Sequence, residues 1–100
     1  MAPKPIKHDQ YVDDLCEQIR DQYEIILRHV PLYSHRRRLI GEVDVLAFKE
    51  NYCDIYEVKC SYRISKARRQ LEKFTKILSK GSNVRGGFFF CGASGTLLSI

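Results

Sequence analysis

The sequence predicts an α/β sandwich, in which helices flank a mixed β-sheet in the order α-β-β-β-α-β. Apolar residues recur at helical spacing over residues 9–30 and again over 65–80. Between them, two strand-like segments at 40–48 and 53–59 are joined by a turn too short for a crossover, so they should pair antiparallel. The apolar run at 87–91 follows the second helix and is typical of a strand buried on both faces beside a parallel neighbour.

The N-terminal part predicts a lead-in and a long helix. Residues 1–8 contain two prolines, two lysines and no apolar period, so we expect a flexible basic lead-in followed by a single domain over 9–100. The first helix should begin at Asp9, a suitable N-cap, and end before Pro31, with one apolar face packed on the sheet. That face consists of Val12, Cys16, Ile19, Tyr23, Ile26, Leu27 and Val30.

The middle of the chain predicts a hairpin. Residues 32–39 are mostly polar and should form a short strand and a turn. A clear strand follows at 40–48, where apolar and polar residues alternate. The segment 49–52 should be a turn, and the partner strand should run from Cys53 to Lys59 or Cys60.

The second helix should begin at Ser65, whose hydroxyl can cap it, and end near Lys80, with Gly81 behind it. Its apolar stripe consists of Ala67, Leu71, Phe74, Ile77 and Leu78. The strand at 87–91 comes next, and a final strand is expected over 96–100.

Composition narrows the class of protein. One hundred residues with 44% apolar content fit one small globular domain. No apolar run approaches the roughly 18 residues of a membrane span, and the N-terminus lacks the apolar core of a secretory signal. We therefore expect an intracellular protein, in the cytoplasm or nucleoid or in a virus-infected host cell. Cysteine and histidine lack zinc-site spacing, which predicts buried reduced thiols and no zinc. The residues concerned are Cys16, Cys53, Cys60, Cys91, His8, His29 and His35.

Positive charge gathers in two clusters. The net charge is +5, from 17 Lys and Arg against 12 Asp and Glu. One cluster precedes the strand at 40–48 and the other follows the strand at 53–59. The two clusters are Arg36, Arg37 and Arg38, and Arg63, Lys66, Arg68 and Arg69. Basic patches favour polyanions because binding releases counterions, so these clusters predict nucleic-acid contacts.

Three acids and a lysine lie on the two central strands. Because side chains alternate along a strand, Glu42 and Asp44 should share one face, with the neighbouring valines on the other. On the partner strand Glu57 and Lys59 also share a face. Three carboxylates and an ammonium could therefore converge. Like charges opposite one another on a sheet cost about 0.2 to 1 kcal/mol per pair, and a bound cation removes that cost.

The G-E-x-D string at 41–44, the E-x-K string at 57–59 and the order of elements resemble the PD-(D/E)xK superfamily, the restriction-endonuclease-like nucleases. The resemblance covers residues 11–92, and small archaeal Holliday-junction resolvases are the most similar members. It implies a restriction-endonuclease-like core and metal-dependent hydrolysis of phosphodiesters. The superfamily's leading proline is absent, because Val43 precedes Asp44.

The resemblance implies roles for the residues of these strings. Asp44, Glu57 and the carbonyl of Val58 would hold Mg²⁺, or Mn²⁺, which acts as a Lewis acid and activates water. Lys59 would orient the attacking water and stabilise negative charge in the transition state. Glu42 either binds a second ion or balances the nearby arginines.

An acid from the first helix often completes this kind of site, and Glu17 and Glu24 both lie beside the apolar stripe. Glu17 matches the position in resolvase-like members better. Gln70 lies near the apolar stripe of the second helix, and the string Q-L-x-x-F at 70–74 resembles the Q-L-x-x-Y motif of RecB-type nucleases. In those enzymes the glutamine supports the active-site strand or contacts phosphate. A partly exposed glutamine at the edge of the stripe is the alternative.

These inferences predict a Mg²⁺-dependent endodeoxyribonuclease of the Holliday-junction-resolvase type. It would act on branched DNA as a homodimer, with apolar residues among 88–90, Leu97 and Leu98 available for the interface. RecB-like or restriction-type cutting uses the same chemistry and stays open. A non-cleaving nucleic-acid-binding module on the same fold is the alternative from another class. A metal-independent ribonuclease is disfavoured, because no spacing of His, Lys and Tyr suits it.

Overall fold

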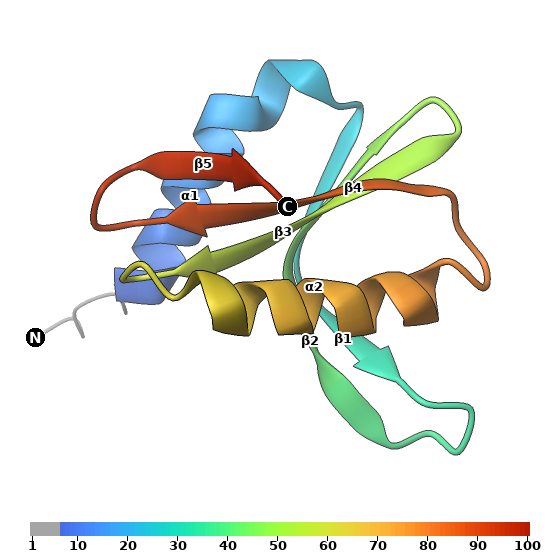
Figure 1. The fold of residues 1–100 in the computed structure, drawn as a ribbon. Helices are drawn as coiled ribbons and strands as arrows, with labels where there is room; N and C mark the ends of the chain where they lie inside the picture. The colour runs from blue at the N-terminus through green and yellow to red at the C-terminus, as the bar shows by residue number, and fades with distance from the viewer. Residues whose placement is uncertain (1–6) are drawn as a thin grey trace, which may run out of the picture.

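A computed structural model describes residues 7–100 of the chain (Figure 1). The elements in chain order are α1 (Lys7–Ile19), a 3₁₀ turn η1 (Arg20–Gln22), β1 (Ile25–Tyr33), β2 (Leu39–Lys49), β3 (Tyr52–Lys59), α2 (Ile64–Leu78), β4 (Val84–Cys91) and β5 (Thr96–Ser99). The first six residues of the expected lead-in lie outside the described residues. Its last two, Lys7 and His8, belong to α1, so the folded part begins two residues earlier than expected.

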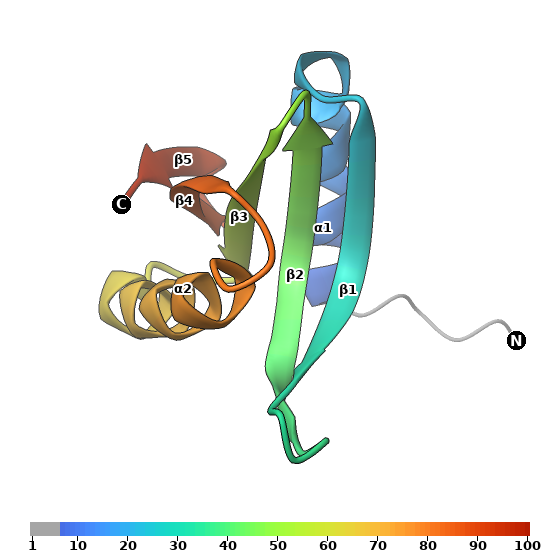
Figure 2. The same cartoon turned by 90° about the vertical axis from the view of Figure 1, so that its right-hand side faces the viewer.

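The strands form one five-stranded sheet in the order β1-β2-β3-β4-β5. β3 and β4 are parallel and α2 connects them, whereas the other neighbouring pairs are antiparallel. The predicted mixed α/β architecture, the β2–β3 hairpin and the parallel strand after the second helix are therefore confirmed. The expected order of elements also holds, and the expected final strand is β5 at the sheet edge (Figure 2). The first strand, expected within 32–39, instead runs over Ile25–Tyr33, and residues 34–38 form the loop after it.

The two helices cover opposite faces of the sheet, because neighbouring residues of β3 pack on different helices. Tyr56 and Val58 lie in a buried cluster with the apolar face of α1. Ile55 lies in a second buried cluster with Leu71 and Phe74 of α2. This alternation buries both faces of β3 and makes it the most buried strand of the hairpin.

The first helix is shorter than predicted, and this prediction is wrong in its second half. α1 ends at Ile19, and the segment predicted as its last two turns is β1. Two β-branched isoleucines there, Ile25 and Ile26, suit a strand, and pairing with β2 overrides a helical period that the short segment 25–30 carries only weakly. Pro31 does not end this element. β1 is an edge strand with a neighbour on one side only, and an edge strand tolerates a residue that has no N–H to donate.

The β1–β2 hairpin changes face at its middle. Val45 packs in the cluster under α1, whereas Val43 packs in the cluster under α2, although a regular strand would place both on one side. The same change occurs in β1 between Ile26 and Val30. His29 stands at this point with φ +52°, in the left-handed region. The expectation that both valines share a face is therefore wrong, because the irregular backbone at His29 interrupts the alternation of the hairpin.

β2 pairs with β3 only from Val45 to Lys49, so the first part of β2 diverges from β3. The diverging part of β2 stays paired with β1, and the two strands run on past the rest of the sheet (Figure 2). A wedge-shaped gap in strand pairing thus opens between Asp44 on β2 and Val58 on β3. This gap positions the candidate site.

The other sequence predictions about composition are confirmed in part. All four cysteines are free, and Cys16, Cys53 and Cys91 are buried as expected, with burial raising the pKa of the Cys16 and Cys53 thiols. Cys60 is exposed, because it follows the end of β3. Across residues 7–100, none of the helices has both the length and the apolar character needed to cross a membrane.

Candidate metal centre between diverging strands

The centre of the candidate site is the main chain of Val58, at the point where β3 has lost its neighbour. The Val58 N–H donates to Asp44 Oδ2 at 2.8 Å, so a side chain of β2 replaces the missing ladder bond. The Val58 carbonyl oxygen lies 3.0 Å from His8 Nε2 at the start of α1, and this nitrogen also lies 3.4 Å from Asp44 Oδ2. α1 and β2 therefore meet β3 at this one residue.

Glu57 is the most unusual residue of the site. Its side chain is almost completely buried, at 1% exposure, and its Oε1 has no hydrogen-bond partner among residues 7–100. Burial and the negative charge of Asp44 raise the pKa of Glu57 from 4.5 to about 8, against the opposing effect of Lys59. Lys59 Nζ lies 3.9 Å from Glu57 Oε2. An orphaned carboxylate oxygen beside a second buried carboxylate is an arrangement that a divalent cation would stabilise.

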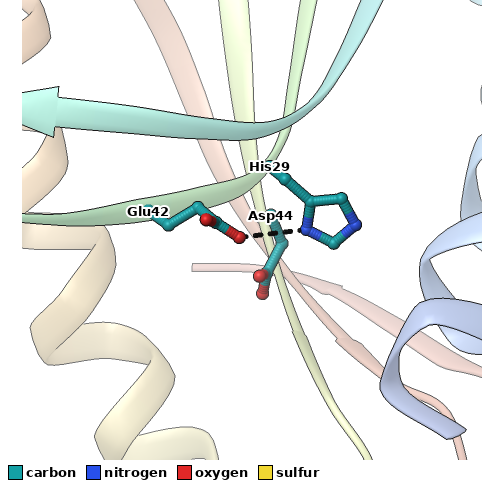
Figure 3. A group of neighbouring side chains, drawn as sticks. All are labelled: His29, Glu42 and Asp44. Carbon is teal, nitrogen blue, oxygen red and sulfur yellow. Dashed lines mark hydrogen bonds and ion pairs between the residues drawn. The ribbon is translucent and has the colours of Figure 1, made fainter. Parts of the chain in front are cut away.

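A second group of possible ligands adjoins Asp44. His29, Glu42 and Asp44 each offer one ligand atom, and these atoms lie within 4.8 Å of one another (Figure 3). The His29 Nδ1 lies 3.0 Å from Glu42 Oε1, and its Nε2 lies 3.6 Å from Asp9 Oδ1. Carboxylates with an imidazole suit Mn²⁺ as well as Mg²⁺, because nitrogen ligands favour transition metals.

The predicted residues of the two central strands do come together. Asp44, Glu57, Val58 and Lys59 surround the divergence point, and Glu42 joins them through His29. His8, Asp9 and His29 were not predicted as site residues. The sequence shows no local pattern that links these three residues. Asp44 lies beside His8, which belongs to α1, and beside His29, which lies on the other strand of the β1–β2 hairpin.

The structure does not bring Glu17 or Glu24 to the site. Glu17 has a 71% exposed side chain and pairs with Arg20, and it lies nine residues beyond His8, about 13 Å further along the helix. Glu24 lies directly before β1, where its carboxylate accepts the N–H of Glu50 at 3.4 Å. The acid that α1 does place beside the site is Asp9, in its first turn.

Gln70 lies on α2 with its side chain half-buried. Its Oε1 is buried and has no hydrogen-bond partner among the described residues. No hydrogen bond within residues 7–100 joins Gln70 to Asp44 or Glu57, and its role in the site stays a prediction.

The predicted nucleic-acid contacts are all exposed. Arg36, Arg37 and Arg38 lie in the loop between β1 and β2, Arg63 lies directly before α2, and Lys66, Arg68 and Arg69 lie on α2. In the part of the chain that the structure describes, none of these seven side chains forms an ion pair, although three other arginines do. They are thus available to an anionic partner.

Comparison with models of protein families finds no match for this chain, and comparison with curated proteins finds none of significant similarity. Its function therefore has to be inferred from the geometry of the site.

Proposed function

We propose that this protein is a metal-dependent endodeoxyribonuclease of the PD-(D/E)xK type. The observation that supports it most is the pair Asp44 and Glu57, both buried and close enough for one charge to raise the pKa of the other, with Lys59 beside them. Two buried carboxylates that face one another are costly without a cation. The order of elements adds support, since the acid lies on β2, the E-x-K string on β3, and α2 crosses to a parallel β4.

The residues fit a hard divalent cation. Asp44, Glu57 and the Val58 carbonyl would hold Mg²⁺ or Mn²⁺, and Glu42 with His29 offers further ligands. The metal, when bound, supplies a Lewis acid and a water of lowered pKa. Lys59 carries a positive charge into the same spot, where it orients the attacking water and stabilises the charge that develops on the phosphate.

The substrate class we propose is branched DNA, cut by a homodimer. Two symmetric cuts require two sites, and residues 7–100 of one chain carry one candidate site. Phe89 and Phe90 cannot supply the interface as expected, because both are buried in the core. Leu97 on β5 and Ile100 after it are each 38% exposed, and β5 is a sheet edge. RecB-like and restriction-type cutting share the same residues and are tested with the same substrates.

The test uses a labelled four-way junction, a linear duplex and a single strand, each with Mg²⁺, Mn²⁺ or EDTA. We expect metal-dependent cutting that falls at least a hundredfold in Asp44→Asn and in Lys59→Ala, because each removes a group from the reacting centre. Asp21→Asn is the control, since Asp21 is an exposed acid on η1 outside the site.

Cutting that both site variants lose and the control keeps would support the nuclease, and preference for the junction would support the resolvase. Activity that EDTA leaves unchanged would contradict the proposal. Binding of DNA without cutting in either metal would leave the non-cleaving module.

A further inference from the structure

The loop that joins β1 to β2 is a projecting and well-bonded turn. Both strands continue beyond the rest of the sheet, and the loop at residues 34–38 lies beyond both helices (Figures 1 and 2). The Ser34 N–H donates to the Arg38 carbonyl and the Arg37 N–H donates to the Ser34 carbonyl, both at 2.8 Å. The Ser34 hydroxyl oxygen accepts the N–H groups of Arg36 and Arg38 at 3.3 and 3.2 Å. The tip of this hairpin is therefore held in one shape, with its arginine side chains outside.

Two large apolar side chains stand uncovered at the base of this loop. Tyr33 and Leu39 are the last paired residues of the hairpin, and they are 56% and 64% exposed. An apolar pair at the end of an edge hairpin favours aggregation unless a partner covers it. We call residues 33–39 the hairpin tip.

The charge of the hairpin tip indicates which kind of partner would bind it. Three adjacent arginines flank the apolar pair, and none is neutralised by an acid within the described residues. A partner must therefore offer negative charge and a flat apolar surface a few ångströms apart. Nucleic acid with an unstacked base meets both demands, since phosphates bind the guanidinium groups and the base face stacks on tyrosine.

The position of the hairpin tip relative to the candidate metal centre fits the same partner. Leu39 and Asp44 lie on one strand, five residues apart, which corresponds to about 16 Å. Duplex DNA rises about 3.4 Å per base pair, so the hairpin tip would lie about five base pairs from a phosphate at Asp44. One DNA molecule can therefore reach both.

We propose that the hairpin tip is a wedge that recognises discontinuities in DNA. Tyr33 and Leu39 stack on the base pair that a branch, fork or nick leaves uncovered, while Arg36, Arg37 and Arg38 bind the flanking phosphates. Insertion into a continuous duplex must first unstack two base pairs, a cost that is smallest where the stack is already broken. This inference rests on the proposed function for the class of substrate, and it adds which feature of the DNA is recognised and by which residues.

The test measures binding in EDTA, so that no cutting takes place. A labelled four-way junction and a continuous duplex of equal length are titrated with the wild type, Tyr33→Ala, Leu39→Ala and Tyr33→Phe. We expect Tyr33→Ala to lower affinity for the junction about tenfold and for the duplex less than twofold, because an aromatic stack on a base is lost. Tyr33→Phe should keep the wild-type affinity, since the ring remains.

Ile25→Ala is the matched control. Ile25 lies at the other end of β1 and is 55% exposed, so its replacement removes a similar apolar surface from the same strand. It should leave both affinities unchanged. A thermal melt of each variant checks the fold, which should be unaffected because Tyr33 and Leu39 are exposed.

Equal affinity of wild type, Tyr33→Ala and Leu39→Ala for the junction would overturn the wedge. So would binding to phosphatidylserine vesicles with no binding to either DNA, which would assign the hairpin tip to a membrane surface. The outcome is independent of catalysis: a junction preference that depends on Tyr33 supports the wedge even if no metal gives cutting. Conversely, metal-dependent cutting with no role for Tyr33 would leave the nuclease and remove the wedge.

Discussion

At the scale of single residues, Glu57 makes the stability of this protein depend on pH. Its pKa is about 8 in the folded protein and 4.5 ordinarily, so between these values the folded protein binds more protons than the unfolded chain. The free energy of unfolding should therefore fall as pH rises from about 5 to 8, by a few kcal/mol. Glu57→Gln, which cannot ionise, should flatten this decline and be more stable than the wild type at pH 8.5.

Urea unfolding at pH 5.5 and 8.5 measures this effect. Glu72→Gln is the control, since Glu72 is an exposed glutamate of α2 and should follow the wild type. Adding Mg²⁺ at pH 8.5 should stabilise the wild type more than Glu57→Gln, because the cation favours the ionised carboxylate. A wild-type stability that rises between pH 5.5 and 8.5 would contradict the buried position of this carboxyl.

The site residues that sequence reasoning found share one property: their grouping is local. Glu57 and Lys59 are two residues apart on a strand, so alternation alone places them together. Asp44 joins them through the short β2–β3 hairpin. His8 and His29 were missed because their positions depend on where α1 begins and on a β1 strand that the sequence does not indicate. Here the limit lies in long-range packing and not in the chemistry of the side chains.

At the scale of elements, segments with a strong local pattern were predicted well, and segments that depend on pairing with distant residues were not. The sequence predicts α2 over 65–80 and the structure has it over Ile64–Leu78, because the segment itself carries a strong apolar stripe. The expected cap at Ser65 is wrong, because Ser65 lies inside the first turn and the N-cap is Arg63, which makes no side-chain capping hydrogen bond. β1 carries no such local pattern. Its conformation is set by pairing with β2. In the turn before it, the Tyr23 hydroxyl donates to Asp54 Oδ2 at 2.5 Å in a partly buried contact. Arg85 of β4 donates to the same carboxylate, and no sequence pattern indicated this group.

The position of α1 depends on a glycine beneath it. A Cβ added at Gly92 would lie 2.1 Å from atoms of the Tyr11 ring, so the ring rests directly on the backbone after β4. Gly92→Ala must push the start of α1 away, and with it His8 and Asp9, which contact the candidate site. We expect a loss of about 1 to 3 kcal/mol in the free energy of unfolding, and lower nuclease activity.

Chemical denaturation and the junction-cutting assay measure the two effects of this change. Gly81→Ala is the matched control, because no atom lies within 4 Å of a Cβ there and its φ is not in the left-handed region. It should match the wild type or exceed it slightly in stability. Equal stability of the two alanine variants would show that Tyr11 turns aside without moving the helix.

At the scale of the whole molecule, the excess of positive charge is placed on two separate elements. One group is the loop of the hairpin tip, and the other lies at the start of α2, with the candidate metal centre on the strands that connect them. DNA that reaches the site from one side would contact one group only, whereas DNA that crosses the site would contact both. The salt dependence of binding distinguishes the two cases, because its slope counts the phosphates that the protein neutralises.

We therefore expect two double variants to act separately and additively. Arg36→Gln with Arg38→Gln, and Arg68→Gln with Arg69→Gln, should each lower the slope of log K against log salt by about 1.8, because each phosphate contact contributes about 0.9. The combined variant should lose the sum, since distant sites act independently.

The control is Arg20→Gln with Lys80→Gln, which removes the same net charge from exposed positions outside both groups. If this control lowers the slope as much as the other two double variants, binding depends on the total charge of the protein and not on the positions of the arginines. If only one of the two basic pairs changes the slope, the DNA lies on that side of the candidate metal centre, and the other group serves a different partner. A lowered slope for both pairs, with none for the control, would mean that the DNA crosses the centre of the site, where a cation held by Asp44 and Glu57 would meet the phosphate between the two contacts.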